Sequence, residues 1–118
     1  MLFDYVDSGN SDLSAYSTER YGNFSGYVQD LLDVIGLLQL SDIIFIGHSV
    51  SSMIGALAEA AVPTLILQCS DDSIVPVEVG EYLHKHLKNS EFRLMQAKGH
   101  YPYISHPEET IALIQGYL

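Results

Sequence analysis

The feature that most constrains this chain is an apolar run at residues 43–46 that ends at Gly47 and is followed two positions later by Ser49. A stretch of small and apolar residues that suits a helix begins directly after the serine. This pattern predicts a buried strand, a sharp turn and a helix, with the serine at the apex of the turn. Such a nucleophile elbow directs a hydroxyl away from the end of a sheet and toward a substrate. The usual pattern is G-x-S-x-G, and here Ser51 stands in place of the second glycine.

The rest of the chain alternates between strand-like and helix-like patterns. Apolar runs predict strands at residues 1–6, 42–47, 64–69 and 91–97. Apolar residues at helical spacing predict helices at residues 25–39, 50–60, 77–87 and 107–118. Ser25 is the expected cap of the first helix, and Pro107 is expected in the first turn of the last. Strands that alternate with helices indicate an α/β fold with a mostly parallel sheet of about four strands. The polar segment 7–24 is expected to be a long loop, either functional or an irregular part of the surface.

Size and charge narrow the classes of function. A chain of 118 residues with 47% hydrophobic side chains is expected to form a single domain with a core. Its formal net charge of -10, with only five Lys plus Arg, argues against nucleic acid and anionic membrane surfaces as partners. No apolar run reaches about 18 residues and no secretory leader is visible, so a cytoplasmic protein is expected. The single cysteine, Cys69, excludes an internal disulfide and suits a buried, inert thiol.

Three kinds of catalytic side chain follow successive predicted strands. Ser49 follows the second strand, Asp71 and Asp72 follow the third, and His100 follows the fourth. Ligands of parallel sheets bind at the carboxyl ends of the strands, so these residues are expected at one edge. A serine needs a base to take its proton, histidine can do so at neutral pH, and a carboxylate orients the imidazole. Taken singly, each residue also suits a turn, a cap or a loop, but together they predict a Ser-His-Asp triad.

Other kinds of site are not expected. The remaining histidines show no clustered Cys/His spacing with metal-ligand character, so no metal is expected. The sequence also contains no G-x-G-x-x-G pattern and no phosphate-binding loop. We therefore expect a protein that works without a cofactor.

Several stretches resemble the RsbQ type of α/β-hydrolase, a group that contains a bacterial stress-response regulator with hydrolase activity and whose relatives include the plant karrikin and strigolactone receptors. The matching stretches are LFDYVDSGNSD at residues 2–12, GHSVSSMIG at 47–55, DSIVP at 72–76, GH at 99–100 and SHPEET at 105–110. The group itself uses the form Gly-His-Ser-Val-Ser, which accounts for the serine at position 51.

The resemblance implies a role for four residues. Ser49 resembles the nucleophile, His100 the base and Asp72 the acid, since the acid of the family stands three residues before Val-Pro. The backbone N–H of Val50 would be one donor of the oxyanion hole. Asp71 remains the alternative acid if the loop has shifted.

The resemblance also implies parts that this sequence does not show. Family members have strands ahead of the Leu-Phe-Asp-Tyr-Val strand, a loop there with the second oxyanion donor, and a lid region after the elbow helix. We therefore expect a reduced α/β-hydrolase domain over residues 1–118, without a lid and with weak catalysis. The bare edge of the first strand and the apolar helix faces predict a homo-oligomer, formed through the exposed sheet edge or by exchanged elements.

The expected activity is that of a serine hydrolase, similar to carboxylesterases, which cleaves small esters through an acyl-enzyme on Ser49. The alternative is a regulatory or interaction module with low turnover, of the stress-signalling or receptor type. A third reading is a chain that is inert and folds only by self-assembly. A reactive Ser49 distinguishes the first of these from the other two.

Overall fold

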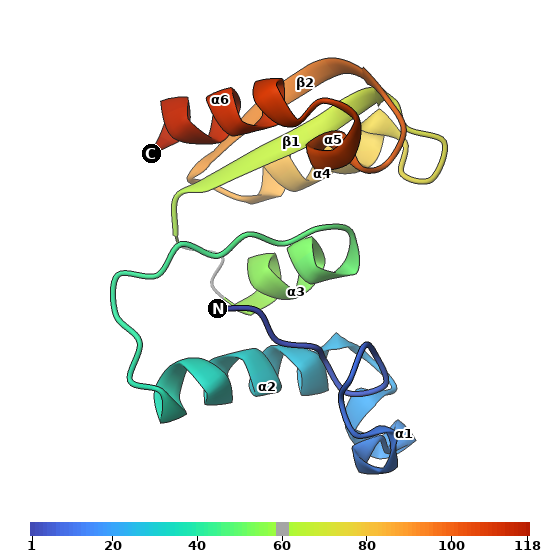
Figure 1. Cartoon of the computed structure of the whole chain (residues 1–118), viewed down its shortest axis with the longest axis vertical. Helices are drawn as coiled ribbons and strands as arrows, with labels where there is room; N and C mark the ends of the chain where they lie inside the picture. Colours follow the sequence, from blue (N-terminus) through green and yellow to red (C-terminus); the bar gives the residue numbers. More distant parts are fainter. Residues whose placement is uncertain (59–61) are drawn as a thin grey trace. The chain divides into compact units, whose positions relative to one another are not determined.

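The computed structural model describes residues 1–58 and 62–118 of the chain. Its contacts divide the chain into two compact units, Met1–Ala60 and Ala61–Leu118 (Figure 1). The expectation of one domain over residues 1–118 stays a prediction. The two units are described separately below.

The first unit is built from helices and extended connections. A 3-10 turn, η1 (Leu13–Ala15), and a short helix, α1 (Thr18–Tyr21), interrupt the segment that was expected to be a loop. The longer helices α2 (Phe24–Leu37) and α3 (Val50–Ala58) follow and pack against each other. Leu31 of α2 and Ile54 of α3 are buried, which is the packing that their apolar, helically spaced sequences predict.

Helix α2 begins one residue before the predicted start, and its cap lies two residues before the predicted one. Asn23 is the cap, and its side-chain Oδ1 accepts a hydrogen bond from the backbone N–H of Ser25 at 2.8 Å. Ser25 therefore lies inside the first turn and is not the cap. Both residues are favourable cap types, so the sequence alone does not rank them.

The second unit is a two-stranded parallel sheet with a helix on each face. Its elements are β1 (Thr64–Asp71), α4 (Val77–His86), β2 (Ser90–Lys98), α5 (Pro102–Ser105) and α6 (Pro107–Tyr117) (Figure 1). The strands pair from Thr64 opposite Ser90 to Cys69 opposite Met95, and the register shifts before Asp71 meets Lys98. Pro107 occupies the first position of α6, as predicted, where its missing N–H costs no hydrogen bond.

One face of this sheet carries the core of the second unit. Cys69, Met95 and Ala97 are buried together, and Leu67 and Leu113 pack against them. Leu113 belongs to α6, so α6 covers this face. Burial raises the pKa of the Cys69 thiol, and the negative charges of Asp72 and Glu109 raise it further by smaller amounts. Cys69 is thus the buried thiol that the sequence predicts.

The prediction of about four strands is wrong for the part of the chain that the structure describes, which contains two. No strand is assigned at residues 1–6 or 42–47, although both sequences suit one. A strand exists only when its backbone N–H and C=O groups pair with a neighbour. Neither segment forms such a ladder within the described ranges. The parallel pairing and the alternation of strands with helices are confirmed in the second unit.

The remaining predicted elements lie within two residues of those observed. The helix expected at residues 50–60 extends to residue 58, and its last two expected residues lie outside the described part of the chain. The four-residue helix α5 was not expected, since it is too short for a periodic pattern. No helix in the described part of the chain is long and apolar enough to cross a membrane.

Candidate active site

Ser49 lies at a sharp turn directly before α3, as the elbow pattern predicts. Its φ angle is +55°, in the left-handed region that side chains with a Cβ rarely adopt. The turn is closed by backbone hydrogen bonds, from Ser51 N–H to His48 C=O and from Ser52 N–H to Ser49 C=O. A Cβ on Gly47 would lie 2.8 Å from the backbone of residues 51 and 52, so only glycine fits there. The side chain of Ser52 adds a 2.7 Å hydrogen bond to the Gly47 carbonyl.

The strain at Ser49 leads to a prediction about stability. We expect Ser49→Gly to be more stable than Ser49→Ala by about 1 kcal/mol, because only glycine adopts a positive φ without steric cost. Urea unfolding of the two variants measures the difference. The same pair of substitutions at Ser25, inside α2, is the control, and there alanine is expected to be the more stable. Equal stability of the two Ser49 variants would contradict a strained elbow.

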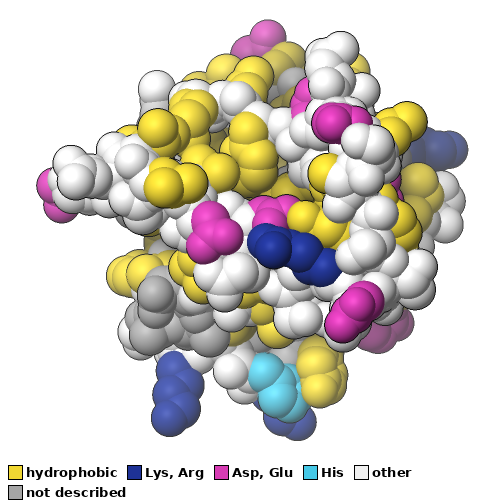
Figure 2. All heavy atoms as spheres, turned by 90° about the horizontal axis from the view of Figure 1, so that it is seen from below, with side chains coloured by type: hydrophobic (Ala, Val, Ile, Leu, Met, Phe, Trp, Pro, Cys, Tyr) yellow, Lys and Arg dark blue, Asp and Glu magenta, His cyan; other side chains and the backbone are white. Residues whose placement is uncertain are grey.

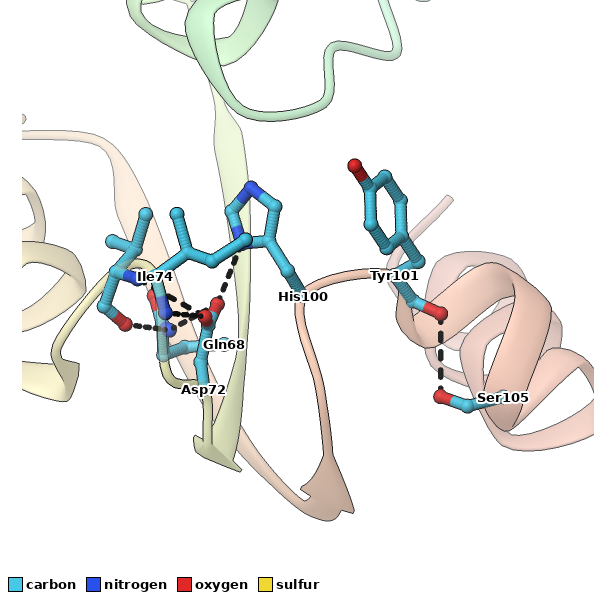
Figure 3. Close-up of polar contacts among 7 residues, drawn as sticks. Gln68, Asp72, Ile74, His100, Tyr101 and Ser105 are labelled. Carbon is cyan, nitrogen blue, oxygen red and sulfur yellow. Dashed lines mark hydrogen bonds and ion pairs between the residues drawn. The ribbon is translucent and has the colours of Figure 1, made fainter.

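Asp72 and His100 form a polar contact between two largely buried side chains in the second unit. Asp72 lies just after β1 and His100 just after β2, so both stand at the carboxyl ends of neighbouring parallel strands (Figure 3). The imidazole Nδ1 lies 2.7 Å from Asp72 Oδ2, and the two side chains are only 9% and 5% exposed. Gly99, with a φ of +97°, turns the chain immediately before His100. The Gly99 N–H also donates to the Asp71 carbonyl at 2.9 Å, which ties the two loops together.

Asp72, which the resemblance predicts as the acid, and its alternative Asp71 have different surroundings. The Asp71 carboxylate is largely exposed, and its nearest charged partner is Lys98 Nζ at 3.9 Å. Asp72 is the buried carboxylate, and its Oδ1 accepts hydrogen bonds from the backbone N–H groups of Ile74 at 2.8 Å and Val75 at 3.0 Å. Asp72 is therefore the carboxylate that can orient His100.

The electrostatics of the pair fix which nitrogen is protonated. Burial by itself raises the pKa of the Asp72 carboxyl, but hydrogen bonds from His100, Val75 and Ile74 outweigh it and hold that pKa below its usual value. The carboxyl is thus ionised at neutral pH and can only accept hydrogen bonds. Nδ1 of the neutral imidazole must then carry the proton, which leaves the lone pair on Nε2. This tautomer is the one that a general base requires.

The lowered pKa also predicts how stability depends on pH. The folded carboxyl of Asp72 releases its proton more readily than in the unfolded chain, so it stabilises the fold fully above the unfolded pKa of about 4. We expect this contribution to be lost as the pH falls below ~4 and through the folded pKa. Urea unfolding of the unsubstituted chain and of Asp72→Asn between neutral and acidic pH measures it. A difference in stability between the two that stays constant into acid would contradict the assignment.

The four predicted site residues form two pairs, one in each unit. Asp72 and His100 contact each other in the second unit. Ser49 and Val50 lie in the first unit, where Val50 is the first residue of α3. The ring of Tyr101 meets that of His100 edge to face, with centroids 5.4 Å apart. Within residues 1–58 and 62–118, no group of three or more His, Cys, Asp or Glu side chains is arranged to hold a metal.

Sequence reasoning missed one polar residue next to Asp72. Gln68, on β1, donates from its amide to the Val75 carbonyl at 3.0 Å and lies 3.4 Å from Asp72 Oδ2 (Figure 3). The signal was present, because Gln68 is the polar residue in the otherwise apolar stretch Leu-Ile-Leu-Gln-Cys. The apolar pattern of a strand does not predict which hydrogen bonds a polar residue within it will make.

Comparison with known proteins shows which proteins this chain is similar to. The chain is 33% identical to the Karrikin insensitive 2 receptor CA of Petunia hybrida over 76 residues, which cover 64% of this chain and 28% of that protein. It is 40% identical to a pimeloyl-[acyl-carrier protein] methyl ester esterase of Neisseria meningitidis over 57 residues, or 48% of this chain and 22% of that one. The matches thus span about a quarter of the length of these curated relatives. No family model matches the chain.

A solved structure matches the fold over nearly the whole chain. The hydrolase olei00960 from Oleispira antarctica superimposes with a TM-score of 0.89 at 22% identity, covering 98% of this chain and 80% of that one. The fold is therefore α/β-hydrolase-like. The chain is related to the α/β-hydrolases that include karrikin and strigolactone receptor esterases and pimeloyl-[acyl-carrier protein] methyl ester esterases.

Proposed function

We propose that this chain is a serine hydrolase that cleaves small carboxylic esters. The observation that carries the proposal is the buried Asp72–His100 pair at the carboxyl ends of two parallel strands. An ionised carboxylate bonded to Nδ1 leaves Nε2 as the base, which is the half of a catalytic triad that activates a hydroxyl. The left-handed turn at Ser49 and the similarity to esterases support the assignment of Ser49 as the nucleophile of the triad.

In the proposed reaction, Ser49 Oγ attacks the ester carbonyl while His100 Nε2 takes its proton. The tetrahedral intermediate collapses when the imidazolium returns that proton to the departing alcohol, which leaves an acyl group on Ser49. Water then attacks the acyl group, with His100 again the base, and Ser49 is released as the hydroxyl. Asp72 orients the ring and stabilises its cation, and no cofactor takes part.

Val50 would stabilise the charge that forms on the carbonyl oxygen. As the first residue of α3, it has a backbone N–H outside the hydrogen-bonded ladder of the helix. The positive end of the helix dipole reinforces this donor. One donor of an oxyanion hole contributes about 3 kcal/mol to transition-state stabilisation.

Hydrolysis of p-nitrophenyl acetate by the purified chain tests the proposal, with Ser49→Ala prepared in the same way. We expect burst-phase release of p-nitrophenol followed by slower turnover, and neither in the variant. Equal release by both proteins would contradict the proposal. Release by neither would favour the alternative, a regulatory or interaction module of low turnover.

We also propose that the chain self-associates. The apolar run before the elbow is exposed, with Ile44 63% and Ile46 73% accessible, and it has no ladder partner in the described part of the chain. Hydrophobic side chains reach the surface in several places on the face shown in Figure 2. An unpaired strand-forming segment with apolar side chains favours pairing with a second copy.

Sedimentation velocity tests this second proposal. We expect a dimer or larger species at micromolar concentration and a monomer for the double variant Ile44→Lys/Ile46→Lys, whose charges oppose pairing. Leu13→Lys is the control, because Leu13 is equally exposed, at 67%, but lies in η1. A monomeric unsubstituted chain would contradict self-association.

A further inference from the structure

Gln68 is a buried polar side chain in the middle of β1, and the mechanism above does not use it. It is 8% exposed, whereas glutamine usually lies at the surface of proteins. A buried amide costs free energy unless it is hydrogen-bonded, so the partners of Gln68 are informative. Figure 3 shows the amide reaching the turn that carries Asp72, next to the carboxylate.

The amide completes the hydrogen bonding of the Asp72 carboxylate. Oδ1 accepts from the N–H groups of Ile74 and Val75, and Oδ2 accepts from His100 Nδ1 at 2.7 Å. Gln68 Nε2 lies 3.4 Å from Oδ2, on the same oxygen as the imidazole. A carboxylate offers about four lone-pair positions, and these four donors use them all. The carboxylate therefore has little freedom to rotate away from His100.

The same amide also holds the turn that supplies two of these donors. Gln68 Nε2 donates to the Val75 carbonyl at 3.0 Å, while the Val75 N–H donates to Asp72. One side chain thus contacts both the carboxylate and the backbone that orients it. Loss of the amide would release both restraints at once.

Packing fixes the position of the Gln68 side chain itself. A Cβ on Gly80 of α4 would lie 3.2 Å from Gln68 Oε1 and 2.7 Å from Phe92 of β2. The helix therefore approaches the sheet at a glycine, and Gln68 lies in the narrow space between them. A side chain confined in this way makes an effective support, because little conformational entropy remains to be lost.

We propose that Gln68 is a positioning residue, which sets the plane of the Asp72 carboxylate and so the orientation of the His100 ring. The effect on catalysis rests on the proposed hydrolase function, whereas the effect on the Asp72–His100 hydrogen bond does not. Gln68 touches no substrate in this account and acts only through Asp72.

The test is an NMR measurement of the His100 Nδ1 proton in the full ¹⁵N-labelled chain. A proton held in a short bond to a carboxylate resonates far downfield of the backbone amides, so it reports the bond directly. We expect this resonance to shift upfield or broaden in Gln68→Met, which has a similar size but no donor. It is expected to persist in Gln96→Met, the control, because Gln96 is exposed on β2. An unchanged resonance in Gln68→Met would overturn the proposal.

If Gln68→Met does not fold, which circular dichroism would show, a second variant is used for the same measurement. Gln68→Leu also removes the amide donor, with a branched apolar side chain of different shape, and the same change in the resonance is expected. If neither variant folds while Gln96→Met does, Gln68 is required for the fold as a whole and the proposal is wrong.

Ester hydrolysis by the same proteins separates this inference from the proposed function. We expect kcat to fall about tenfold in Gln68→Met, as for other residues that orient a catalytic group, with KM unchanged. A shifted resonance without any turnover in the unsubstituted chain would support the positioning role and contradict the hydrolase. Normal kcat together with a shifted resonance would overturn the catalytic part of the inference.

Discussion

Asp72→Asn is expected to lower kcat for ester hydrolysis by about four orders of magnitude, the loss that amide replacement of the triad acid causes in a serine protease. The amide can present an N–H to Nδ1, which then has to accept the bond. The proton of the imidazole moves to Nε2, and the base is lost. The fold is expected to survive, because asparagine has the same shape as the aspartate.

Asp71→Asn is the matched control for this prediction. Asp71 is the neighbouring residue with the same chemistry, but its side chain is 66% exposed and faces Lys98. We expect its kcat to stay near that of the unsubstituted chain, with pre-steady-state and steady-state rates measured on the same ester. A large loss in Asp71→Asn with activity retained in Asp72→Asn would show that the wrong carboxylate has been assigned.

Met95→Ala is expected to have the largest effect on stability, lowering the free energy of unfolding by about 3 kcal/mol. Met95 is 1% exposed on β2 and packs with Cys69 on β1. Its truncation leaves a cavity in a core of few residues, where little else can move to fill it. Urea unfolding followed by circular dichroism measures the change.

Leu94→Ala provides the comparison, since Leu94 is the preceding residue of the same strand. It is 43% exposed, so its truncation is expected to cost about 1 kcal/mol or less. Similar losses at both positions would indicate that the face of the sheet covered by α6 is not the core of this unit.

The sequence predicts the second unit well because each of its strands has a pairing partner within the same unit. β1 and β2 are apolar runs that pair with each other, and α4 and α6 cover the two faces. The run at residues 42–47 has an equally strong strand pattern, yet no strand forms there in the described structure. Periodicity reports the tendency to form a strand, but the strand itself requires a second segment with free backbone groups.

In the candidate site, too, the sequence predicts some contacts, whereas others depend on how distant segments pack. The position of Asp72 and His100 after successive strands predicts that they lie at one edge, and they are in contact. The resemblance predicted Asp72 as the acid with Asp71 as the alternative, and the structure shows Asp72 turned inward to His100 while Asp71 is exposed. Gln68 was missed because its contacts are with Val75, in the turn after β1, and with α4, and a strand pattern does not reveal tertiary contacts.

The most direct test of the central claim is labelling of the chain with a fluorophosphonate, followed by mass spectrometry of the intact protein and its peptides. An activated serine attacks the phosphorus and retains one phosphonyl group, whereas ordinary hydroxyls do not react. We predict a single adduct on Ser49, no adduct in Ser49→Ala, and strongly slowed labelling in His100→Ala. Absence of an adduct, or an adduct that persists in Ser49→Ala, would contradict the account of this chain as a serine hydrolase.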